Sequence, residues 1–169
     1  MPRTQIRQAR LVGTAVVTGS AAAWTLTGNV TTLTYSNFVA ASGSIYTVTG
    51  EAIAPSTNVP GFKFASLEAG DYRIEYEGEI DGQNAGYQYY FRFSDGTNGT
   101  REQVGLNCPI IGASINCVSG TLNYTTAQTN VTFQLQCKEV NGGGPTSPTV
   151  QNTSTRNGTF RLWFFPTTT

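Results

Sequence analysis

The segment Tyr72–Phe93, YRIEYEGEIDGQNAGYQYYFRF, decides the fold that we predict for this chain. In its first half every second residue is apolar or glycine, and charged residues fill the positions between them. Tyr87–Phe93 repeats the alternation with aromatic residues. A period of two is typical of a β-strand with one buried face. We therefore predict two strands, each with an aromatic row in the core.

The link between these strands, Asp81–Gly86, contains two glycines and other turn-forming residues, which predicts a hairpin. Pairing Ile80 with Tyr87 matches the two faces and places Glu75 opposite Arg92 on the outside. A slip by one residue would turn the aromatic row to solvent. The pattern therefore predicts a register as well as a hairpin.

Further alternating segments are separated by turn formers along the rest of the chain. We predict the additional strands at residues 11–18, 30–35, 44–53, 62–67, 101–106, 113–118, 121–124, 130–140 and 159–166. No segment predicts a helix, and turn signals recur every 8–12 residues or so, as is typical of sandwiches and barrels. The sequence thus predicts an all-β fold, a two-sheet antiparallel jelly-roll sandwich.

Composition excludes several functions. The 169 residues carry no net charge, only 12% of them are charged, and histidine is absent. Without a basic field we expect no nucleic-acid partner, and without an apolar run of about 20 residues we expect no membrane span. The missing imidazole removes the commonest general base and metal ligand. We expect no catalytic residue, no metal and no cofactor, and hence a protein that is not an enzyme.

Two acidic patterns suggest chemistry but have simpler explanations. The acidic row from Glu75 to Asp81 has a spacing that a glycoside hydrolase or a calcium site could use, yet strand alternation produces such rows by default. The segment Asp95–Gly99 resembles a calcium loop and also reads as a plain turn. We interpret the first as a solvated face and the second as a turn.

The three cysteines, Cys108, Cys117 and Cys137, are an odd number, which disfavours a secreted disulfide framework. We interpret them as small core residues of a protein made in a reducing cell. A bridge between Cys108 and Cys117 stays open as an alternative.

The last predicted strand is apolar on both faces, which indicates that something covers its outer face. An N-terminal arm or a loop could do so, and a second subunit is the interpretation that we favour. The residues predicted at the subunit interface are Phe160, Leu162, Trp163, Phe164 and Phe165.

We predict two parts in the chain: an N-terminal anchoring arm at residues 1–24 and a jelly-roll domain at residues 25–169. The arm is rich in arginine, and its residues predicted to anchor the protein are Arg3, Gln5, Ile6, Arg7 and Arg10. The same stretch also has the outline of a signal peptide, although its apolar part is short and interrupted.

Two resemblances add to this interpretation. The order of a short strand, Leu67–Tyr72 and an apolar C-terminal strand resembles the trimeric jelly rolls of the C1q and tumour-necrosis-factor type. The segment Arg3–Arg7, RTQIR, is similar to the start of many tailed-phage virion proteins. Together they imply a homotrimeric phage structural protein whose arm grips the particle and whose β-domain projects.

The function that we predict is therefore that of a non-enzymatic virion protein, located in the virion and bound to capsid or tail proteins as shell cement or as a receptor-binding projection. The alternative is a secreted carbohydrate-binding or C1q-like ligand-binding module. A host surface glycan is the further partner that we expect at exposed loops. The candidate loop residues are Asp81, Gly82, Asn84, Asp95, Asn98 and Asn141.

Overall fold

The computed structural model describes residues 8–18, 24–26, 35–40, 45–54, 61–81, 89–100, 103–104, 114–139, 149–151 and 158–166. Within these ranges the chain forms thirteen strands and no helix. The strands are β1 (Arg10–Thr18), β2 (Trp24–Leu26), β3 (Ser36–Ala40), β4 (Ile45–Gly50), β5 (Ala52–Ile53), β6 (Phe62–Leu67), β7 (Gly70–Asp81), β8 (Tyr89–Ser94), β9 (Gln103–Val104), β10 (Ser114–Tyr124), β11 (Gln128–Glu139), β12 (Thr149–Gln151) and β13 (Thr159–Phe165). The predicted all-β class is confirmed.

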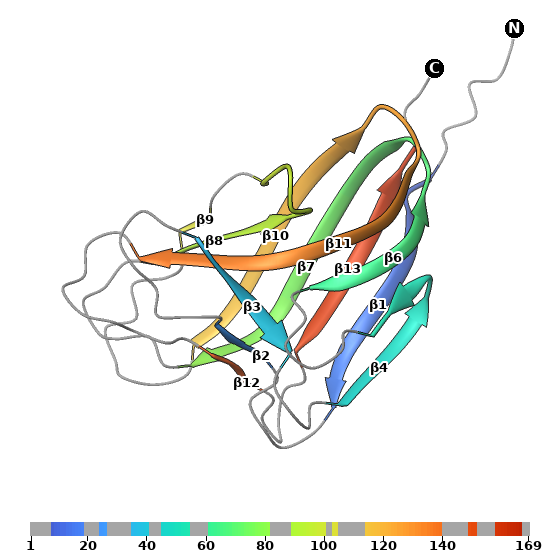
Figure 1. Cartoon of the computed structure of the whole chain (residues 1–169). Coiled ribbons are helices and arrows are strands. Elements are labelled where there is room, and N and C mark those ends of the chain that lie inside the picture. Colours follow the sequence, from blue (N-terminus) through green and yellow to red (C-terminus); the bar gives the residue numbers. More distant parts are fainter. Residues whose placement is uncertain are drawn as a thin grey trace, which may run out of the picture.

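The strands form two layers, as Figure 1 shows. The first layer has the order β4–β1–β13–β7–β10, and the second has the order β9–β8–β11–β6–β5. The short strands β12, β2 and β3 connect β7 of the first layer to β11 of the second. Every pairing between described strands is antiparallel, so the predicted two-sheet antiparallel jelly-roll sandwich is confirmed.

The predicted hairpin between β7 and β8 is wrong. β7 lies in the first layer with β10 on one edge and β13 and β12 on the other, whereas β8 pairs with β11 and β9. Glu75 therefore lies opposite Ser119 and Arg161, and Arg92 lies opposite Gln136. Alternation fixes which face of a strand is buried, but two such strands can equally lie side by side or face each other across a core.

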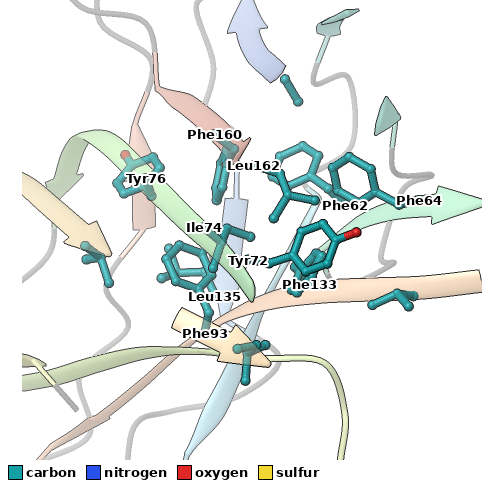
Figure 2. Close-up of a cluster of buried hydrophobic side chains, with 14 of the residues drawn as sticks. Phe62, Phe64, Tyr72, Ile74, Tyr76, Phe93, Phe133, Leu135, Phe160 and Leu162 are labelled. Carbon is teal, nitrogen blue, oxygen red and sulfur yellow. The ribbon is translucent and has the colours of Figure 1, made fainter. Parts of the chain in front are cut away.

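The buried faces were predicted correctly, and they meet in an aromatic core (Figure 2). Tyr72 and Tyr76 of β7 and Phe91 and Phe93 of β8 are all at most 1% exposed. The ring of Phe160 in β13 of the first layer packs against the ring of Phe62 in β6 of the second layer (Figure 2). The largest fully buried side chains of the core are those of Phe38, Phe62, Tyr72, Tyr76, Tyr89, Phe91, Phe93, Phe133, Leu135 and Leu162.

Strand β1 belongs to the sandwich, because it pairs with β13 on one side and β4 on the other. Residues 10–18 are therefore not part of an arm, and the predicted domain boundary at residue 24 is wrong. Of the predicted arm, residues 1–7 and 19–23 lie outside the described residues. Any arm that precedes the sandwich ends at or before residue 9.

A β-bulge in β1 changes which residues face outward. Leu11 lies opposite Trp163 and Gly13 lies opposite Leu162, so Val12 is one extra residue in β1. Strict alternation would place Val12 and Thr14 on one face, whereas Val12 is buried at 4% exposure and Thr14 is half-buried on the other face. A Cβ atom at Gly13 would lie 2.8 Å from the Thr49 carbonyl oxygen, so this close strand approach requires glycine.

Two smaller predictions have different outcomes. β10 runs without a break from Ser114 to Tyr124, so the predicted division at Ser119 and Gly120 is wrong. Cys137 is fully buried, as expected for a small core residue. Cys108 lies outside the described residues.

Candidate functional site

The outer face of the first layer carries three neighbouring apolar side chains. Trp163 in β13 lies opposite Leu11 in β1, and Phe165 is two residues further along β13 on the same face. Leu11 is 44% exposed and Phe165 is 39% exposed, while Trp163 is half-buried. We call these three residues the outer patch. Exposed contiguous apolar surface with a polar rim is typical of protein interfaces.

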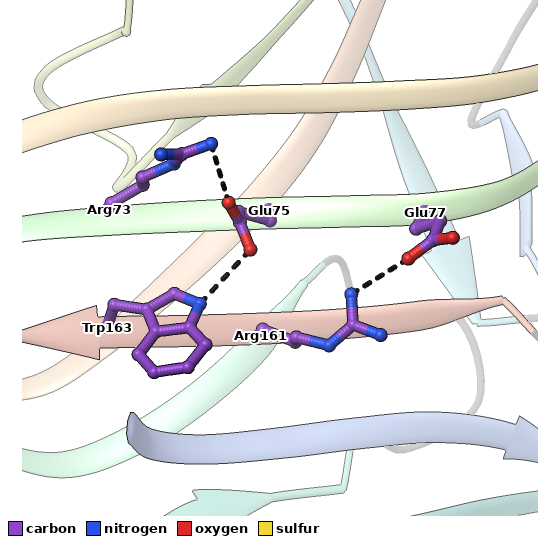
Figure 3. Close-up of polar contacts among 5 residues, drawn as sticks. All are labelled: Arg73, Glu75, Glu77, Arg161 and Trp163. Atoms are coloured by element: carbon purple, nitrogen blue, oxygen red, sulfur yellow. Dashed lines mark hydrogen bonds and ion pairs between the residues drawn. The ribbon is translucent and has the colours of Figure 1, made fainter. Parts of the chain in front are cut away.

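A ladder of polar contacts borders the outer patch (Figure 3). The indole Nε1 of Trp163 donates to Oε2 of Glu75 at 3.1 Å, and Arg73 pairs with the same carboxylate at 2.7 Å. Arg161 donates to Glu77 at 3.0 Å. Such exposed pairs each contribute about 0–1 kcal/mol to stability. Their main effect is that two cations neutralise the two carboxylates, so this face carries little net charge.

The ladder also explains part of the acidic row from Glu75 to Asp81. Glu75 and Glu77 each form an ion pair with a neighbouring arginine, so both carboxylates have structural partners. The side chains of residues 79–81 lie outside the described residues.

The five predicted interface residues divide between two faces. A single chain already buries Phe160, Leu162 and Phe164, which are at most 5% exposed and point into the core. Their assignment to a subunit interface is therefore corrected. Trp163 and Phe165 lie on the outer face, where the interface prediction still applies.

Leu11 belongs to the outer patch and was missed by the sequence prediction. Its place there depends on its pairing with Trp163 and on the bulge that follows it. Neither is visible in a period-two pattern.

Of the predicted anchoring residues, Arg10 is part of the sandwich. It lies opposite Phe164, with its guanidinium carbon 5.0 Å from the centroid of that ring, and it forms an ion pair with Glu68. Arg10 thus packs against one end of the core, which corrects its assignment to a free arm. The other four predicted anchoring residues, Arg3, Gln5, Ile6 and Arg7, lie outside the described residues.

A cavity of about 250 Å³ lies beside Arg10 and Glu68 at this end of the sandwich. The Tyr72 hydroxyl donates to the Glu68 carbonyl oxygen at 3.0 Å. Burial, with a smaller contribution from the Glu68 carboxylate, raises the pKa of Tyr72 to about 12. The phenol is therefore neutral at physiological pH and serves as a donor.

The predicted loop residues have three different outcomes. Asp81 is the last residue of β7 and pairs with Thr149, so its assignment to a loop is wrong. Asp95 and Asn98 lie in a turn after β8, as predicted, and Asn98 is exposed. The remaining candidates, Gly82, Asn84 and Asn141, lie outside the described residues.

The turn after β8 is held together by the Asp95 carboxylate. Its Oδ1 accepts from the backbone N–H groups of Thr97 at 2.8 Å and Asn98 at 2.6 Å. Its Oδ2 accepts from the Tyr124 hydroxyl at 2.9 Å. Because protein donors occupy both oxygens, the plain-turn interpretation explains the carboxylate without a calcium ion.

These contacts shift two pKa values. Burial raises the pKa of Asp95, but the hydrogen bonds from Asn98, Thr97 and Tyr124 outweigh it, so the pKa is lowered from 3.8. Burial and the neighbouring carboxylate raise the pKa of Tyr124. The stabilisation that depends on ionised Asp95 is therefore present above its unfolded pKa, and it is lost as pH falls through the lower folded pKa.

We expect a Tyr124→Phe substitution to lower the free energy of unfolding at pH 7 by about 1 kcal/mol, because it removes a hydrogen bond to a partly exposed carboxylate. The loss should shrink at pH 3, where unfolded Asp95 is protonated. Urea denaturation at the two pH values measures this. Tyr72→Phe, which loses a bond to a backbone carbonyl, is the matched control and should show no such pH dependence. Equal losses from Tyr124→Phe at both pH values would contradict the assignment.

A second cavity, of about 390 Å³, opens next to this turn, and we call it the end cavity. Three segments form it: the turn after β8, the end of β10 and the start of β11. Its lining residues are Asp95, Thr97, Asn98, Asn123, Tyr124, Thr125, Gln128, Thr129, Asn130 and Val131. All but Val131 have polar side chains, so the cavity is suited to a polar ligand.

The described part of the chain shows no group of three or more potential metal ligands drawn from histidine, cysteine, aspartate and glutamate. None of the described residues forms a helix that could cross a membrane.

Comparisons with known proteins identify the fold. No protein-family model matches the sequence, and no curated protein sequence matches it either. Among solved structures, the PRD1 vertex protein P5 matches with a TM-score of 0.51, over 94% of this chain and 99% of that chain. The two sequences are 11% identical over the match. This chain therefore has a fold similar to that of PRD1 vertex protein P5.

Proposed function

We propose that this chain is a non-enzymatic structural protein of a phage particle, a trimeric jelly roll that its N-terminal segment fixes to the capsid or tail. Two observations and one resemblance support the proposal. The fold is similar to that of a phage vertex protein over nearly the whole of both chains. The segment Arg3–Arg7 resembles the start of many tailed-phage virion proteins. The outer patch provides a surface for a neighbouring subunit.

The outer patch is the observation that carries the proposal. It places Leu11, Trp163 and Phe165 together on the outer face of a two-layer sandwich, where a strand normally faces water. Covering a large apolar side chain contributes about 1.5–3 kcal/mol. A second copy of this chain is a suitable cover, because the bordering ion pairs leave little net charge to repel an identical face.

The N-terminal segment is the part that we assign to the particle. β1 begins at Arg10, so the segment available for anchoring is residues 1–9, shorter than the arm predicted from sequence. Of the rest of the predicted arm, residues 10–18 pair with β13 and β4, and Trp24 is the first residue of β2.

Light scattering on the purified full chain tests the oligomeric state. We expect a mass three times that of one chain, and the mass of a single chain at micromolar concentration would overturn the trimer. Mass spectrometry of purified particles tests the location. A chain that copurifies with particles through a density gradient supports the virion role, and a chain that remains in the soluble fraction contradicts it.

A further inference from the structure

The end cavity is polar but carries no free carboxylate. Asp95 is the one acidic residue in the part of the lining that the structure describes, and both of its oxygens accept hydrogen bonds from protein donors. The described residues that line the cavity include no lysine or arginine. A ligand therefore meets neutral carboxamides and hydroxyls rather than a charged site.

The orientation of three carboxamides in the cavity is fixed by their partners. Asn98 donates through Nδ2 to a carboxylate oxygen of Asp95 at 3.3 Å. Asn123 donates through Nδ2 to Oδ1 of Asp71 at 2.6 Å, and Gln128 donates through Nε2 to a backbone carbonyl at 2.9 Å. A carboxylate or a carbonyl can only accept, so each amide nitrogen must lie toward its protein partner. The three carbonyl oxygens, which accept no hydrogen bond from other described residues, remain as acceptors for a ligand.

Asn130 adds a fourth carboxamide. Its φ is +54°, in the left-handed region that asparagine tolerates better than most residues. It lies within β11, where such a conformation is unusual, and its side chain is exposed at the cavity. Hydroxyl groups of Thr97, Thr125 and Thr129 complete a lining that can both accept and donate.

We propose that the end cavity binds a neutral saccharide unit. Sugar hydroxyls are donors, and the cavity offers them an excess of fixed carbonyl acceptors together with threonine hydroxyls. An anionic ligand would find acceptors where it needs donors, and the described residues offer it no cation in the lining. This inference rests on the proposed virion role only for the source of the ligand, a glycan of the host surface.

Nuclear magnetic resonance titration of the full chain tests the site. The probes are methyl glycosides of glucose, galactose, mannose and N-acetylglucosamine at millimolar concentration, and calcium chloride in a separate titration. We expect at least one glycoside to shift the backbone amides of the turn after β8 and of residues 128–131. Shifts with calcium alone, or no shift at the cavity with any of the four glycosides, would overturn the proposal.

Three variants locate the binding. Asn130→Gly removes a carboxamide while keeping a residue that accepts a positive φ, and Thr129→Ala removes a hydroxyl. Each should weaken binding by about tenfold, the effect of one lost hydrogen bond. Thr121→Ala, an exposed threonine of β10 outside the cavity, is the matched control and should leave the affinity unchanged. Unchanged affinity in both cavity variants would overturn the site.

The oligomer measurement separates this inference from the proposed function. A trimer on particles that binds no glycoside overturns the saccharide site alone. A monomer in the soluble fraction whose cavity binds a glycoside overturns the virion role and leaves the site standing.

Discussion

A Phe160→Ala substitution is expected to lower the free energy of unfolding by about 3–5 kcal/mol. The Phe160 ring belongs to the first layer, and its centroid lies 4.1 Å from that of Phe62 in the second layer. It also lies 4.8 Å from Tyr76 and 6.5 Å from Phe93. Alanine at this position would leave a cavity between the two sheets that these three aromatic neighbours cannot fill by small movements.

The matched control for this prediction lies in the same strand. Phe165 is the same residue type in β13 but is 39% exposed on the outer face, whereas Phe160 is 4% exposed. Phe165→Ala should lower the free energy of unfolding of the isolated chain by less than about 1 kcal/mol, because it removes little buried apolar surface. Urea denaturation of both variants, at a concentration where the chain is monomeric, measures the difference. Equal losses would show that Phe160 does not join the layers as described.

The fold class followed from sequence because the alternation of buried and exposed residues is local. The faces of β7, β8 and β13 were all predicted correctly, since each depends only on the side-chain period of a single strand. Partners were not predicted, because pairing is a property of two strands. Glu75 and Arg92 have opposite charges that would suit adjacent strands of a hairpin. In the structure, Glu75 instead forms an ion pair with Arg73 and accepts a hydrogen bond from Trp163.

The same limit explains which residues of the candidate surfaces could be predicted and which could not. Trp163 and Phe165 were found because their own strand was apolar on both faces. Leu11 was not, because its exposure depends on a bulge and a partner 152 positions away in the chain, at Trp163. The end cavity combines three segments that meet only in the folded sandwich. The one part of the cavity that the sequence pattern indicated is the turn at Asp95. There the Asp95 carboxylate accepts hydrogen bonds from the backbone of the turn, which forms part of the cavity wall.

We expect Leu11→Asp to convert the trimer to single chains. Leu11 belongs to the outer patch and is 44% exposed in one chain, so an aspartate there is tolerated by the isolated fold. In the trimer the same aspartate would be buried against a neighbouring copy, and burying an unpaired carboxylate costs several kcal/mol. Light scattering should show the mass of one chain while the far-ultraviolet circular dichroism stays that of a β-sandwich.

Ile53→Asp is the matched control, because Ile53 is an isomeric side chain with the same 44% exposure on β5 of the other layer. It should leave the trimer intact. Trp163→Asp should also dissociate the trimer, but it places a carboxylate beside Glu75 and removes an indole hydrogen bond, so it weakens the monomer as well. Leu11→Asp is thus the cleaner test. If Leu11→Asp stays trimeric while Ile53→Asp dissociates, the subunits meet through the second layer and the outer patch is not the interface.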